Sequence, residues 1–137
     1  MSKLSDPLKV ATLRGFLRRK EMLEAAGGAL TPDQVAKILA LSTETVDKRR
    51  SSNQLLAVPR GVHGFSYPRF QFDDGKTLAG LEDALEVLRA VDPWMQLNFF
   101  TTSNGRLDGK TPIEALRSGE IDQVVKMANI YGEQGAL

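Results

Sequence analysis

The chain has 137 residues, 42% of them hydrophobic, and a formal net charge of +1. This length and composition suit one compact unit or two small ones and exclude an intrinsically disordered chain. Cysteine is absent, which excludes disulfides, thiolate metal sites and cysteine nucleophiles. No apolar run approaches the roughly 20 residues of a membrane span, and the first residues lack the apolar core of a secretion signal. We therefore expect a cytoplasmic protein with no membrane contact.

The charges are divided unevenly along the chain. Residues 1–69 contain 12 Lys and Arg against 6 Asp and Glu, whereas residues 70–137 contain 6 against 11. A basic first half suits a polyanion, and an acidic second half suits solvent or a basic partner. A difference of this size also arises by chance in a short chain, so the charge pattern alone does not identify a function.

The first predicted helix runs from Asp6 to Ala26. Asp6 and Pro7 are typical of a helix start, and the two glycines after Ala26 are typical of a helix end. We expect this helix to pack beside the next helices or to act as a dimer arm. Its basic cluster is either a solvated face or a set of phosphate contacts. The apolar side consists of Leu13, Phe16, Leu17 and Leu23, and the basic cluster of Arg14, Arg18, Arg19 and Lys20.

Residues 31–50 have the pattern of a helix-turn-helix. Thr31, Pro32 and Gln34 form a capping box with proline at the first helical position. Ser42 can cap a second helix whose Val46 points back toward the first helix. Apolar residues at helical spacing and a small residue at the predicted crossing complete the pattern. The inward stripe is Val35, Ala36 and Leu39, and the turn is Ala40 and Leu41.

The second helix of this pair is the predicted recognition helix. At about 100° per residue, an inward Val46 turns Glu44, Lys48 and Ser51 outward. Base-edge contacts are predicted for Thr43, Glu44, Thr45, Lys48 and Ser51. Backbone contacts are predicted for Arg49 and Arg50, whose stems run along the buried side. The alternative interpretation is a solvated, charged helix face.

Residues 55–72 predict a β-hairpin directly after the recognition helix, which is the position of a wing. Two runs rich in branched and aromatic residues flank the tip Arg60-Gly61-Val62-His63-Gly64. Pro59 and Pro68 restrict the strands to an edge or to brief pairing. Arg60 and Arg69 are predicted to reach the DNA backbone or minor groove. His63, the one histidine, is predicted to be an exposed bystander on the loop.

The second half predicts a helical module. A Leu-rich amphipathic helix is followed by a helix that begins at Asp92-Pro93, by a short helix with a second capping box at Thr111, and by a final helix. Residues from Tyr131 onward predict a small, mobile tail. The predicted inward residues are Leu78, Leu81, Ala84, Leu85, Leu88, Val91, Trp94, Leu97, Phe100, Ile121, Val124, Val125 and Ala128.

The predicted fold is therefore mainly α. Residues 1–76 are expected to form a helix-turn-helix DNA-binding domain with a short β-hairpin wing, and residues 77–137 a small helical, partner-binding domain. No nucleophile lies in an activating motif, and no glycine-rich loop suits a phosphate, so an enzyme is not expected. No cofactor or metal site is predicted.

The run from Gly109 to Gly119, GKTPIEALRSG, has the spacing Gly-x-Thr-Pro-x-Glu-x-Leu-x-x-Gly. With the helices from Ala79 to Ala128 it resembles the toxin-binding domain of the Xre/MbcA/ParS-type antitoxin family. The resemblance implies a type II antitoxin that represses its own operon, binds operator DNA as a homodimer and covers a cognate toxin, commonly a RES-domain enzyme that degrades NAD. It implies partner contacts at Thr111, Pro112, Glu114, Arg117, Tyr131, Gly132, Glu133 and Gln134.

Two features depart from that family. The wing is more similar to an excisionase or MerR-like arrangement, and Ala40 stands where a turn glycine is common. Two alternatives therefore stay open: a stand-alone regulator of a phage, excisionase or mobile-cassette type, and a purely protein-binding module without a toxin.

Overall fold

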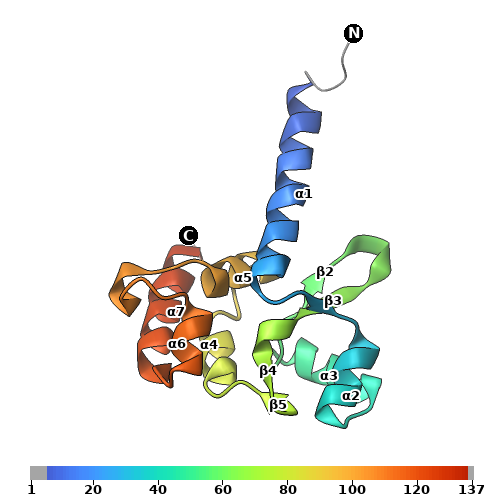
Figure 1. The fold of residues 1–137 in the computed structure, drawn as a ribbon. Coiled ribbons are helices and arrows are strands. Elements are labelled where there is room, and N and C mark those ends of the chain that lie inside the picture. Colours follow the sequence, from blue (N-terminus) through green and yellow to red (C-terminus); the bar gives the residue numbers. More distant parts are fainter. Residues whose placement is uncertain (1–5, 136–137) are drawn as a thin grey trace.

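The computed structural model describes residues 6–135, and helices make up most of it (Figure 1). A small antiparallel sheet lies between the helix-turn-helix and the C-terminal helices, so the predicted fold class is confirmed. The helices are α1 (Pro7–Ala25), α2 (Pro32–Leu39), α3 (Thr43–Ser51), α4 (Leu81–Val87), α5 (Pro93–Thr101), α6 (Pro112–Arg117) and α7 (Ile121–Gly135). The strands are β1 (Ala29–Leu30), β2 (Val58–Pro59), β3 (Phe65–Pro68), β4 (Phe72–Asp73) and β5 (Lys76–Thr77).

The predicted hairpin is present as β2 and β3, paired antiparallel with Val58 opposite Ser66. Three strands form one sheet in the order β1-β3-β2, so β3 is central and β2 is at the edge, while β4 and β5 pair separately. The strand β1 was not predicted, because two residues are too few for an alternating pattern. It pairs Leu30 with Tyr67 and so attaches the chain just before the helix-turn-helix to the wing.

The helix starts follow the sequence signals. Both capping boxes are formed: the hydroxyl of Thr31 accepts from the Gln34 N–H, and that of Thr111 accepts from the Glu114 N–H. The side chain of Asp92 accepts from the Trp94 N–H at 2.9 Å. These bonds satisfy donors that have no partner within their own helix. Local chemistry therefore determines where these helices begin.

Two hydrophobic clusters form the core. The smaller one joins α2, α3, β1 and β3. The larger one joins the C-terminal end of α1 to the helices α4–α7. Residues 55–58 serve both clusters in alternation: Leu55 and Ala57 belong to the smaller, and Leu56 and Val58 to the larger. The packing is thus not divided between residues 76 and 77, and the functional division predicted there stays a prediction.

Gln71 fixes this shared segment. Its side chain is fully buried, and its amide accepts from the Leu56 N–H at 2.9 Å and donates to the Leu56 carbonyl at 2.7 Å. The same amide donates to the Pro68 carbonyl at 3.0 Å. A buried amide satisfied in this way replaces the partner strand that residue 56 lacks on this side. Gln71 therefore holds the extended segment against the end of β3.

The position of α1 corrects one expectation. This helix does not pack beside the helix-turn-helix; its C-terminal end packs against α5 and the larger cluster, while the rest extends away from the body (Figure 1). Leu23 is buried as predicted, but Leu13, Phe16 and Leu17 are exposed. Gly27 and Gly28, both at positive φ, turn the chain away from α2 and so separate the two elements. The dimer-arm alternative stays a prediction.

The predicted mobile tail is also wrong over the described residues. The helix α7 continues through Gly135, and the Tyr131 hydroxyl accepts from the Asn98 amide at 3.1 Å. The ring of Tyr131 packs against Phe99. A Cβ added at Gly132 would lie 3.2 Å from the Val87 carbonyl oxygen, so the glycine permits close approach of α4. Tertiary contacts here override the low helix propensity of glycine. Ala136 and Leu137 lie outside the described residues.

Between residues 6 and 135, no helix combines the length and the apolar character needed to cross a membrane.

Replacing Gln71 by Leu should lower the free energy of unfolding by about 3 kcal/mol, because it leaves the Leu56 N–H and two carbonyls buried without partners. Urea denaturation measures this loss. Gln123→Leu is the matched control, since Gln123 is exposed on α7 and should change stability little. Equal effects of the two substitutions would contradict the role given to Gln71.

Candidate nucleic-acid interface

The helix-turn-helix is held by its own small core. Val35 of α2 and Val46 of α3 are fully buried against each other's helices. Between the helices, Ala40 adopts a left-handed conformation with φ 55°, the conformation that the expected turn glycine would adopt freely. The strain on an alanine there is about 1 kcal/mol. Ser42 then caps α3 by accepting from the Thr45 N–H at 3.1 Å. The pattern predicted for residues 31–50 is therefore formed.

The outer face of α3 is open to solvent. Glu44, Lys48 and Ser51 are exposed, as the helical period predicted, and Thr43 is exposed beside them. Thr45 is half-buried, and its hydroxyl lies 2.9 Å from the Ser42 hydroxyl. Four of the five predicted base-contact residues therefore form an accessible surface, and the fifth also stabilises the helix start. Their contact with bases stays a prediction.

Arg50 lies between the recognition helix and the wing. Its Nε donates to the Asp47 carboxylate at 2.8 Å, and its guanidinium stacks over the Phe65 ring of β3 at 4.0 Å. Only 24% of its side chain is exposed. Charge pairing and cation–π contact together hold this side chain in place. Arg50 therefore orients β3 against α3. Arg49 is half-buried, as predicted for a stem that follows the buried side.

The hydroxyl of Tyr67 belongs to the same contact. Burial raises the pKa of Tyr67 above its ordinary value, while the nearby Arg50 guanidinium lowers it in part and Asp47 raises it. The neutral phenol is thus favoured in the folded protein.

The wing tip presents an apolar residue that was not among the predicted contacts. A short helical turn, Gly61–His63, closes the tip, and the Arg60 N–H donates to the Gly64 carbonyl at 2.7 Å. Val62 at its apex is 98% exposed, between the exposed side chains of Arg60 and His63. An apolar residue between glycines in a loop is the signal that would have identified it. Wings and arms that enter the minor groove use such apolar and cationic side chains together.

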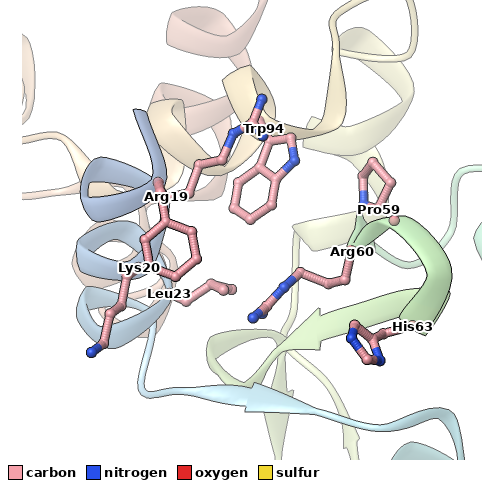
Figure 2. A pocket seen from close by; sticks show the side chains of 9 residues that line it. Arg19, Lys20, Leu23, Pro59, Arg60, His63 and Trp94 are labelled. Atoms are coloured by element: carbon pink, nitrogen blue, oxygen red, sulfur yellow. The ribbon is translucent and has the colours of Figure 1, made fainter. Parts of the chain in front are cut away.

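A cleft separates the wing from α1 (Figure 2). Arg60 reaches from the wing into this cleft, and Arg19 of α1 lies over the Trp94 ring, 4.9 Å from its centroid. Lys20 points away from the cleft. The cleft has a volume of about 550 Å³, and its lining contains no carboxylate. The lining residues are Phe16, Arg19, Lys20, Leu23, Pro59, Arg60, Gly61, His63 and Trp94. Arg19 of the α1 cluster therefore lies across the cleft from Arg60 of the wing.

Arg69 does not line the cleft between the wing and α1. It follows β3 at the end opposite the wing tip, where its N–H donates to the Gly28 carbonyl at 3.0 Å and its stem covers Gly27. Arg69 is exposed, but the structure does not bring it together with Arg60.

The predicted partner-binding residues fall into two groups. Thr111, Pro112 and Glu114 build the start of α6: the Glu114 carboxylate accepts from the Thr111 N–H at 2.9 Å, and Pro112 is buried. These bonds lower the pKa of Glu114. Tyr131 and Gly132 are half-buried in the contacts of α7. The exposed group, accessible to a partner, consists of Arg117, Glu133 and Gln134.

Comparison with known proteins gives one structural likeness. No protein-family model and no curated protein matches the chain. The fold is similar to a solved structure described as "NMR structure of Rv2175c", with a TM-score of 0.65 and 21% identity, over 76% of this chain and 80% of that chain. At this identity the likeness concerns the fold alone. The resemblance to the Xre/MbcA/ParS-type antitoxins depends on the motif in the sequence.

Replacing Arg50 by Gln should raise the pKa of Tyr67 further, because it removes the positive charge that lowers it. Since the folded-state pKa already lies above that of the unfolded chain, the stability from the neutral phenol is present below the unfolded pKa and is lost as pH rises through the folded value. Ultraviolet titration of the tyrosines measures the shift. Arg49→Gln is the control, and an equal shift in both variants would contradict the contact.

Proposed function

We propose that this protein is a sequence-specific DNA-binding regulator. The observation that supports it most is the exposed face of α3, on a capped helix-turn-helix, directly attached to a wing with an apolar and cationic tip. This arrangement suits insertion of α3 in a major groove and of the wing tip in the neighbouring minor groove.

The charges around α3 and the wing support the same proposal. Within residues 6–135 the ion pairs are Arg50–Asp47, Arg89–Glu86 and Lys110–Glu120. Lys48, Arg49 and Arg60 belong to none of these pairs. The charges of Arg49 and Arg60 are thus available to phosphates and that of Lys48 to a base edge, and neutralising phosphates releases counterions from the duplex. Docking on the backbone would fix the register in which Glu44, Lys48 and Ser51 meet base edges.

Lys48→Ala should weaken binding to the DNA upstream of the gene about tenfold and leave the fold unchanged. If Lys48 contacts a phosphate, the slope of log affinity against log salt should fall by about one. Fluorescence anisotropy at several salt concentrations measures both. The matched control is Lys126→Ala, since Lys126 is exposed on α7, far along the chain from α3. Equal binding of the upstream DNA and of random duplex by the unaltered protein would contradict the proposal.

We further propose that the regulator is a type II antitoxin, with operator DNA bound by α3 and a cognate toxin, such as a RES-domain enzyme, bound by the C-terminal module. The complete Gly109–Gly119 motif supports this proposal. The structure of this segment supports it as well. Thr111 and Glu114 fix the start of α6, and Arg117 at its other end is exposed and accessible to a partner. The stand-alone regulator is the alternative.

Co-expression with the neighbouring reading frame tests the antitoxin proposal. We expect a complex that survives purification and that Arg117→Glu weakens, because a reversed charge in an interface adds repulsion. Lys126→Glu is the control for a charge reversal elsewhere on the module. Absence of a complex with either neighbour would favour the stand-alone regulator. Deleting the chain from Gly132 is unsuitable, since Gly132 and Tyr131 are part of the α4 and α5 contacts of α7.

A further inference from the structure

The helix α1 extends away from the rest of the molecule over most of its length (Figure 1). Every side chain from Pro7 to Glu21 is exposed or half-buried, and the first buried one is Leu23. Four of the seven large apolar side chains that are strongly exposed within residues 6–135 lie on this helix: Leu8 at 79%, Leu13 at 48%, Phe16 at 62% and Leu17 at 46%. Helices in proteins gain most of their stability from packing of an apolar face, so packing against a partner would stabilise α1.

One face of α1 collects most of these apolar side chains. At about 100° per residue, the positions of α1 within about 60° of Leu13 are Lys9, Val10, Phe16, Leu17, Lys20 and Glu24. Val10 is half-buried, and the other side chains of this face, Leu13 included, are exposed. The larger cluster and α5 contact a different side of the helix, through Met22, Leu23 and Ala26. This face, Lys9 to Glu24, is therefore accessible over about 22 Å at 1.5 Å per residue, and at Phe16 it borders the cleft toward the wing.

We propose that this face is the homodimer interface and that two copies of α1 pair antiparallel. The charges on the face favour a second copy in this orientation. When the pair is centred between residues 16 and 17, Phe16 of each copy meets Leu17 of the other, and Leu13 meets the aliphatic stem of Lys20. Lys9 then lies level with Glu24 at each end of the pair. A parallel pair would instead place Lys9 against Lys9 and Glu24 against Glu24.

The flank of the helix has the same complementarity. Arg14 and Glu21 lie on one side of the face, about 100° and 80° from Leu13. In an antiparallel pair related by a twofold axis, the same flanks of the two helices adjoin. Arg14 of one copy then lies within about two residues of the level of Glu21 of the other. Both acidic residues of α1 thus meet a basic residue of the second copy, while α1 alone carries five basic residues.

Sedimentation velocity of the DNA-free protein tests the pairing. We expect a monomer–dimer equilibrium in which Lys9→Glu and Glu24→Lys each weaken dimerisation about tenfold, because each turns two attractive pairs per dimer into repulsive ones. The variant with both substitutions should restore dimerisation, since residues 9 and 24 again carry opposite charges. A chain that remains monomeric, as it would if α1 bound a different protein, overturns the proposal. Single reversals without effect also overturn it.

Disulfide trapping tests the orientation independently, because the chain has no cysteine. Leu17→Cys should cross-link under mild oxidation, since the two copies of residue 17 lie near the twofold axis. Leu13→Cys should not, because its two copies are about 10 Å apart along an antiparallel pair. Cross-linking of both variants would indicate a parallel pair and overturn the proposal. The interface does not depend on the proposed function, and failure of DNA binding would leave these measurements unchanged.

Discussion

The structure depends on the four extended residues 55–58, whose side chains enter two cores in alternation. An extended chain directs successive side chains to opposite sides, so Leu55 and Ala57 complete the helix-turn-helix core while Leu56 and Val58 complete the larger one. Gln71 holds this segment in place through both backbone groups of Leu56. Asn53, at positive φ just before the segment, adds a side-chain bond to the Leu85 carbonyl of α4. The two parts of the molecule are therefore connected by buried, specific contacts as well as by the chain.

A fixed orientation matters for a helix that reads DNA, as we propose for α3. The face of α3 is useful only if it is held at a defined angle to the wing, and Arg50 provides that restraint through Asp47 and Phe65. Because Arg50 is held in these contacts, its charge is not free to contact phosphates. Arg49 and Arg60 retain that role in our proposal, Lys48 meets a base edge, and Val62 adds an apolar contact at the wing tip. Orientation and charge are thus supplied by different residues.

Two glycines lie where the C-terminal helices approach each other closely, and at Gly80 an added side chain would collide with its neighbours. A Cβ added at Gly80, which has φ 86°, would lie 2.7 Å from the Ile121 side chain, and one added at Gly132 would lie 3.2 Å from the Val87 carbonyl oxygen. These approaches hold α4 against α7 and convert the predicted tail into helix. The partner that we propose would therefore meet a formed helical surface on this module, where Arg117, Glu133 and Gln134 are exposed.

The sequence by itself determined the features that depend on neighbours along the chain. Capping residues and helical spacing identified the helix-turn-helix, the inward Val46, the outward Lys48 and the starts of α5 and α6, because a cap and an amphipathic stripe depend on residues a few positions apart. Only the tertiary structure decided the direction of α1, the continuation of α7 past Gly132, the use of Arg50 as a restraint and the burial of Gln71. Each depends on a partner distant in sequence: α5 for α1, Val87 for Gly132, Phe65 for Arg50 and Leu56 for Gln71. Local periodicity contains no information about which distant surface covers an apolar or polar group, and that choice is made by packing.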